Sequence, residues 1–116
     1  MKKPDDYVRL RHILDSARKA VQFSQGRNLG DMSSDEMLNL ALTRLLEIIG
    51  EASKEVSEEF RDEHPQIAWQ QMAGMRNRLI HGYFDANATL VWETVNRDLP
   101  PLIVQLEKVL EHGKTL

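Results

Sequence analysis

The chain has 116 residues, with 15 lysines and arginines, 18 aspartates and glutamates, and no cysteine. This length suits a single domain over residues 1–116, and the lack of cysteine excludes a disulfide framework, a thiolate metal site and a cysteine nucleophile. No apolar run is long enough for a signal peptide or a membrane span, so the sequence predicts a cytoplasmic protein with no membrane partner.

Apolar residues at helical spacing run through nearly the whole chain. Between residues 7 and 21 they recur every three or four positions, which predicts an amphipathic helix that ends before Gly26. A second helix is predicted from Ser33, or from the serine after it, to about Phe60, because Ser33 and Glu36 have the spacing of a capping box. Its apolar stripe is broad, which indicates burial on two sides, either within one bundle or across a homodimer interface.

The second half of the chain predicts further helices. Pro65 suits the first turn of a third helix, which ends near Gly82. After a short segment at residues 89–95, Asp98 has the position of an N-cap before two prolines and opens a last helix that ends at Gly113. The alternating patterns typical of strands are missing. The sequence therefore predicts an all-α fold, a four- to five-helix up-down bundle.

The net charge of −3 is unevenly distributed along the chain. Residues 1–27 carry four more basic than acidic groups, residues 28–64 carry seven more acidic than basic groups, and residues 65–116 are balanced. An anion responds to the local field, which salt screens over roughly 10 Å. The acidic total therefore does not exclude a nucleic-acid partner, although most of these charges are also explained as solvated helix faces.

The four histidines do not form any familiar metal pattern. They are His12, His64, His81 and His112. None has a glutamate three residues before it, as di-metal bundles require, and the pattern His-Glu-x-x-His is absent. Phosphate-binding glycine loops are also absent, so no metal or cofactor is expected. Structural or solvated roles are favoured for all of these histidines except His81.

The segment from Gly74 to Phe84 concentrates the reactive side chains of the chain. Within eight residues it holds Arg76, Asn77, Arg78, His81 and Tyr83. Arginine matches a phosphate with a fixed fork of donors, and histidine both takes and gives a proton near neutral pH. RNA supplies its own nucleophile in the 2′-hydroxyl, so cleavage needs only a base, an acid and a cation. Spacing alone favours another interpretation, in which the arginines are solvated and the histidine caps the end of a helix.

The sequence resembles the HepT toxins of the HEPN superfamily of prokaryotic ribonucleases. The resemblance is carried by Gly-Met-Arg-Asn-x-Leu-Ile-His-Gly-Tyr with Arg76-x4-His81-x-Tyr83, by Val91-Trp92-Glu93, by Asp98-Leu99-Pro100, by Leu46 to Ala52 and by Trp69. It implies a HEPN-like helical bundle that forms a homodimer, with two motifs facing each other in a cleft, and metal-independent cleavage of RNA, either tRNA or mRNA. In this reading Arg76 binds phosphate and stabilises the transition state, and His81 transfers protons. Two chains then supply the two proton-transfer groups that one chain lacks.

The resemblance also implies supporting residues. Asn77 would position His81 or contact phosphate, with helix packing as the alternative. Glu47 and Glu51 would form a polar ladder that orients the motif arginine, or are ordinary exposed charges. Further RNA contacts would come from Arg78, Arg9 and Arg11, for which solvation is the alternative reading.

Tyr83 has a second role in the resemblance. HepT toxins are usually encoded beside a small nucleotidyltransferase antitoxin, which in studied members transfers AMP to the tyrosine of this motif. The added charge and bulk would then block the cleft. Tyr83 could instead be a stacking platform or a partly buried phenol. Two other functions stay open: a helical adaptor that presents substrates to a nucleotidyltransferase, and a metal-dependent enzyme.

Overall fold

The computed structural model describes residues 5–80 and 84–115, and for residues 76–78, 80, 84–86 and 112–115 it describes the backbone alone. The elements in chain order are α1 (Asp5–Ser24), α2 (Asp31–Ser34), α3 (Glu36–Glu55), α4 (Glu58–Glu63), α5 (Trp69–Ile80), α6 (Phe84–Glu93), η1 (Thr94–Asp98) and α7 (Leu99–Thr115). The described residues contain no strand. The predicted all-α fold is confirmed.

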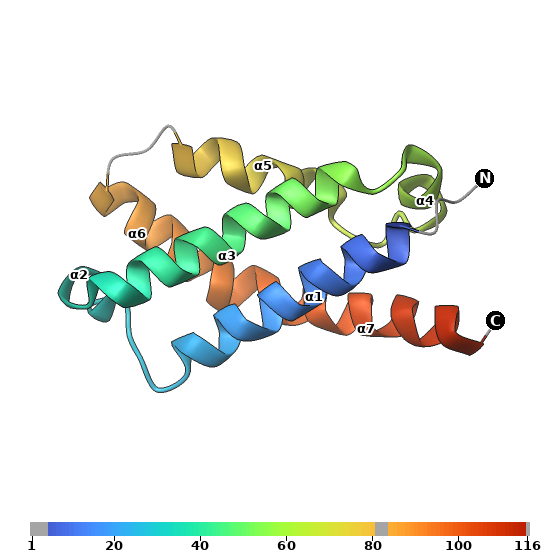
Figure 1. The fold of residues 1–116 in the computed structure, drawn as a ribbon. Coiled ribbons are helices and arrows are strands. Elements are labelled where there is room, and N and C mark those ends of the chain that lie inside the picture. The colour runs from blue at the N-terminus through green and yellow to red at the C-terminus, as the bar shows by residue number, and fades with distance from the viewer. Residues whose placement is uncertain (1–4, 81–83, 116) are drawn as a thin grey trace.

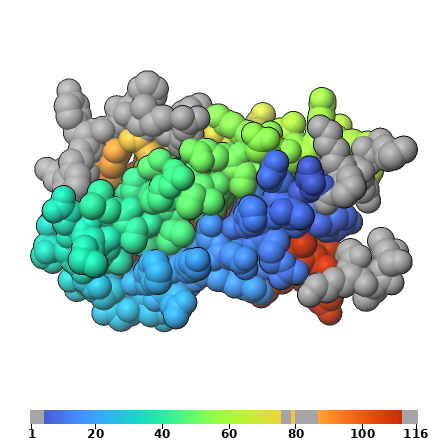
Figure 2. All heavy atoms as spheres, in the orientation of Figure 1, coloured from blue at the N-terminus to red at the C-terminus, as the bar shows by residue number. Residues whose placement is uncertain are grey.

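The long helices form an up-down bundle (Figure 1). α3 packs against α1 on one side and α5 on the other, and α7 packs against α1. Successive long helices run in opposite directions, so the start of α1 and the end of α7 lie at the same end of the molecule (Figure 1). Seen from the side shown in Figure 2, α1 and α3 form most of one face. No helix among the described residues is long and apolar enough to cross a membrane.

The core forms because α1 and α3 bury the apolar stripes that the sequence predicts. Leu10, Ile13 and Ala17 of α1 are fully buried, as are Leu42 and Ile49 of α3. Each large aliphatic side chain removed from water in this way stabilises the fold by about 1.5–3 kcal/mol. The broad stripe of α3 is accounted for within one chain, because α1 and α5 pack on it from two sides.

The predicted bounds of the second helix are wrong at both ends. α3 is capped by Asp35 and not by Ser33: the backbone of Asp35 is extended, and its carboxylate accepts a hydrogen bond from the Leu38 amide at 3.2 Å. The helix also stops at Glu55, because Val56 is extended and Ser57 caps the separate helix α4.

A buried carboxylate explains the break before α4. Asp6 is 1% exposed and accepts hydrogen bonds from both the amide and the hydroxyl of Ser57, at 2.8 and 2.7 Å. The start of α1 is thereby tied to the start of α4. Because a buried carboxylate without partners is costly, this contact favours the extended backbone at residue 56 over a continuous helix.

The start of α5 also differs from the prediction. Pro65 lies in a turn closed by a hydrogen bond from the Ile67 amide to the His64 carbonyl, and α5 begins at Trp69. Trp69 is 8% exposed, and its indole nitrogen donates to the His64 carbonyl at 2.9 Å. Its ring lies edge-on to Phe60, so Trp69 is a core residue.

The last helix begins earlier than predicted. α6, η1 and α7 follow one another without a break, and Asp98 lies inside this run and does not cap its start. The five residues of η1 form a π-helical segment in which the Leu99 amide donates to the Thr94 carbonyl. Pro100 and Pro101 explain the segment, because they lack amide donors and their rings clash with carbonyls four residues earlier. A wider turn accommodates both effects.

Candidate functional site

The motif begins on the last turns of α5. The backbones of Arg76, Asn77 and Arg78 lie within this helix, and their side chains are not among those described. His81 and Tyr83 lie outside the described residues. The distance between Arg76 and His81 is therefore untested, and the roles assigned to these five residues remain predictions.

The end of α5 is held in place from two directions. Met72, Met75 and Leu79 are 7% exposed or less and anchor the helix on the core. From α6, the side-chain amide of Asn87 donates to the Leu79 carbonyl at 2.7 Å. Carbonyls in the last turn of a helix have no partner within the helix, so this bond satisfies one of them. The residue whose carbonyl is held lies two positions before His81 in the sequence.

Asn87 was missed by the sequence reasoning. An asparagine early in a helix has several common roles, and no local pattern marks one that reaches back to the preceding helix. The contact becomes visible only in the folded chain, where Asn87 of α6 lies beside Leu79 of α5.

Glu47 and Glu51 lie where the sequence places them, on the outer side of α3. The Nη1 atom of Arg44 lies 3.5 Å from Glu47 and 3.7 Å from Glu51. All three side chains are roughly one third exposed or more. The three residues form an ion-pair network within one helix, and water screening keeps its contribution to stability small. That Glu47 and Glu51 orient the motif arginine stays a prediction.

Arg9 and Arg11 do not share a surface. Arg9 lines an open groove between α1 and α3, whose other lining residues are His12, Arg44, Ile48, Glu51, Ala52 and Glu55. Its Nη2 atom lies 3.9 Å from Glu55, and its Nε atom is buried without a hydrogen bond. Arg11 lines a second groove between α1 and α7, where Arg18 pairs with Glu107. Because the two arginines are two positions apart in the helix, their side chains leave it about 200° apart, on nearly opposite sides.

Metal-binding residues do not gather in the part of the chain that the structure describes. No group of three or more histidine, aspartate and glutamate side chains lies close enough there to hold one ion.

Comparisons with known proteins point to one family. Residues 13–109 match the family described as ribonuclease HepT-like. A protein of Caldanaerobacter subterraneus named as a candidate RNase is 40% identical over 98% of this chain and 100% of its own length. Another from Methanocaldococcus jannaschii is 37% identical, over 94% and 100%. The "probable ribonuclease HepT" of Thermococcus cleftensis is 38% identical, over 86% and 91%. No solved structure gives a significant match.

Proposed function

The chain belongs to the HepT-like ribonuclease family, and from this premise we propose that it is a toxin that cleaves RNA without a metal ion. The observation that carries the proposal is the extent of the match. The family match spans residues 13–109 and so includes the whole segment from Arg76 to Tyr83. That segment supplies the cation and the proton-transfer group that RNA cleavage requires.

The proposed reaction uses the 2′-hydroxyl of RNA as the nucleophile. One His81 removes the hydroxyl proton, the oxygen attacks the neighbouring phosphorus, and the bond to the 5′-oxygen breaks. A protonated His81 from a second copy of the chain gives a proton to that leaving oxygen, so the products are a cyclic phosphate and a 5′-hydroxyl. Arg76 binds the phosphate oxygens on which negative charge develops. Because each copy has one such histidine, the proposal requires a homodimer.

Neutralisation is proposed to occur at Tyr83. A nucleotidyltransferase antitoxin in the same cytoplasm would transfer AMP from ATP to the tyrosine oxygen and release pyrophosphate. Each AMP brings a negative phosphodiester beside the groups proposed to bind RNA phosphate. Repulsion and bulk would then keep RNA out of the site.

The proposal is tested by incubating the purified protein with RNA in EDTA. We expect the wild type to cleave, and His81→Ala and Arg76→Ala each to slow cleavage by about 10²- to 10⁴-fold. His12→Ala is the matched control, because His12 is an exposed histidine of α1, and it should cleave normally. Circular dichroism must show that all variants fold.

A folded His81→Ala variant with full activity would refute the mechanism. Intact RNA in every wild-type reaction would favour the adaptor, and cleavage that EDTA abolishes would favour a metal-dependent enzyme. In the same assay, prior incubation with the antitoxin and ATP should protect RNA from the wild type. It should not protect RNA from Tyr83→Phe.

A further inference from the structure

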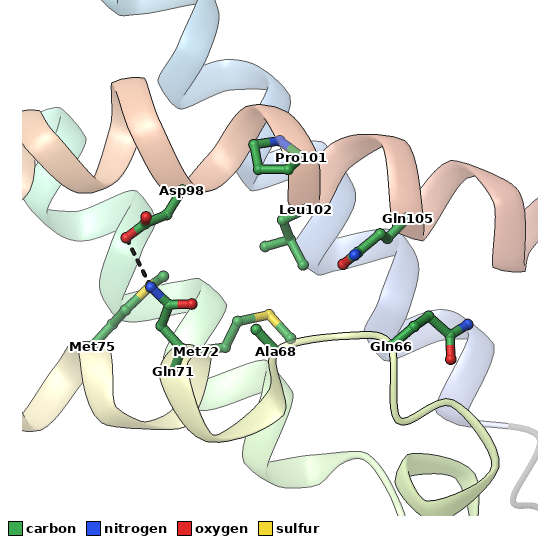
Figure 3. Close-up of a pocket in the computed structure, with 9 residues that line it drawn as sticks. All are labelled: Gln66, Ala68, Gln71, Met72, Met75, Asp98, Pro101, Leu102 and Gln105. Carbon is green, nitrogen blue, oxygen red and sulfur yellow. Dashed lines mark hydrogen bonds between the residues drawn. The ribbon is translucent and has the colours of Figure 1, made fainter.

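A pocket lies between α5 and α7, in what we name the α5–α7 seam (Figure 3). Its lining residues are Gln66, Ala68, Gln71, Met72, Met75, Asp98, Pro101, Leu102 and Gln105. The two helices rest on different neighbours, since α5 packs on α3 and α7 packs on α1. The seam is left as a hollow of about 160 Å³.

The walls of the pocket are apolar in the middle and polar at the ends. Leu102 and Met72 face each other across it, and both are 5% exposed or less (Figure 3). At one end the Gln71 amide donates to the Asp98 carboxylate at 2.9 Å. At the other end lie the side-chain amides of Gln66 and Gln105 (Figure 3). A small flat ring with an apolar face and polar edges matches this pocket, with its face on the buried floor of Met72 and Leu102.

The charge of the pocket selects against phosphate. No lysine or arginine lines it, and its one charged residue is Asp98. Glutamine amides offer both donors and acceptors, whereas a carboxylate only accepts hydrogen bonds. A ring bound here would therefore be uncharged and would present a donor to Asp98.

The backbone at the pocket is shaped by the unusual segment η1. Asp98 is its last residue, and Pro101, which belongs to the proline pair behind the wide turn, lines the pocket. Single π-helical turns are found frequently at functional sites. Asp98 has no part in the proposed cleavage reaction.

We infer that the α5–α7 seam binds one nucleobase that carries an exocyclic amino group: adenine, cytosine or guanine. The amino group donates to Asp98, the glutamine amides bond the other polar edge, and the ring lies over the apolar floor that Met72 and Leu102 form. The assignment of this base to an RNA chain rests on the proposed function. We assign the base to RNA because one helix, α5, carries both the pocket residues Gln71 and Met75 and the phosphate-binding candidate Arg76.

Binding of free nucleosides tests the pocket independently of cleavage. Adenosine, cytidine, guanosine and uridine are titrated into the labelled protein, and the side-chain amide signals of its glutamines are followed by NMR. We expect the signals of Gln66, Gln71 and Gln105 to shift saturably, with uridine binding roughly threefold to tenfold more weakly than the other three. Asp98→Asn should reduce this preference, because the new amide also donates.

Two glutamine-to-leucine variants test whether nucleoside binding depends on the residues that line the pocket. Gln105→Leu should weaken nucleoside binding roughly threefold to tenfold. Gln70→Leu, the same change at an exposed glutamine that does not line the pocket, should have no effect. The inference is overturned if no nucleoside binds, if both variants weaken binding equally, or if Asp98→Asn keeps the full preference.

A pool of short RNAs with random sequence tests whether the bound base belongs to an RNA chain. We expect the wild type to prefer adenine, cytosine or guanine at one position near the cut, and Asp98→Asn to relax that preference. If nucleosides bind but the preference is unchanged, the pocket serves a free nucleoside or nucleobase and the assignment to RNA is overturned. If nucleosides bind and no RNA is cut, the proposed function fails while the base pocket stands.

Discussion

The α1–α3 pair and the α5–α7 seam are built in different ways. α1 and α3 face each other with fully buried side chains such as Leu10 and Leu42, and Arg27 in the loop between them bonds to Asp31 and Asp35. Across the α5–α7 seam, Gln71 bonds to Asp98 beside a hollow. A close-packed interface stabilises the fold, whereas an interface that leaves a pocket with polar ends can bind a ligand.

The largest expected difference between the two regions concerns leucine-to-alanine changes. Leu10→Ala in α1 should lower the free energy of unfolding by about 2–5 kcal/mol, because it leaves a cavity in a packed core. Leu102→Ala should cost less, about 1–2 kcal/mol, because part of this side chain already faces the pocket. Urea denaturation measures both values. Equal losses would show that the α5–α7 seam is as tightly packed as the core.

A smaller effect is expected at the end of α5. Asn87→Asp keeps the size of the side chain but removes the donor to the Leu79 carbonyl, so it should cost about 0.5–1.5 kcal/mol of stability. The kcat of RNA cleavage should fall by more than this loss of stability explains, because His81 follows the last turn of α5, which the hydrogen bond to Leu79 holds in place. We expect KM to change little.

The matched control for this prediction is Asn96→Asp. Asn96 donates to the Trp92 carbonyl at 2.9 Å from an exposed position in η1. Its replacement removes the same kind of hydrogen bond far along the chain from the motif. If both variants lose kcat equally, Asn87 has no special part in positioning the motif.

The smallest expected effect is the response of the α1–α3 loop to acid. The Arg27 guanidinium, which bonds to Asp35 at 2.9 Å, holds the pKa of that carboxyl below its ordinary value. A lowered pKa in the folded state contributes stability above the unfolded pKa of about 4, and this stability is lost as pH falls through the folded value. Both groups are exposed, so the effect is small.

Arg27→Ala measures this contribution. Because it removes the cause of the shift, the variant should lose less stability than the wild type when pH is lowered from 5 to 3. Arg97→Ala, which removes an exposed ion pair with Glu93, serves as the control. A wild type and an Arg27→Ala variant with the same pH dependence of unfolding would contradict the assignment.

The helices were predictable because their signal is local. Apolar residues three and four apart in α1 and α3 are buried as the periodicity predicts. The exact ends of the helices were not predictable, because Ser33 and Asp35 are both good N-caps and only the folded chain distinguishes them. The proline pair was read as a helix start, whereas the chain continues through it with a π-helical segment.

The candidate site divides in the same way. The types and spacing of Arg76, His81 and Tyr83 can be read directly from the sequence. Helical spacing also separates Arg9 from Arg11, although the grooves that they line, against α3 and against α7, needed the structure. Asn87 and the glutamines of the α5–α7 seam gave no pattern, because Asn87 and Gln71 bond to residues on other elements and the pocket forms only between packed elements.

By itself the sequence determined the helical fold class, the buried faces and the set of side chains proposed for RNA cleavage, since these depend on residues close together in the chain. Tertiary structure alone decided where helices stop and where a pocket forms. Asp6 acts on Ser57 across 51 positions, and Asp98 meets Gln71 across 27. Contacts at such separations exist only once the helices have packed, so no local pattern records them.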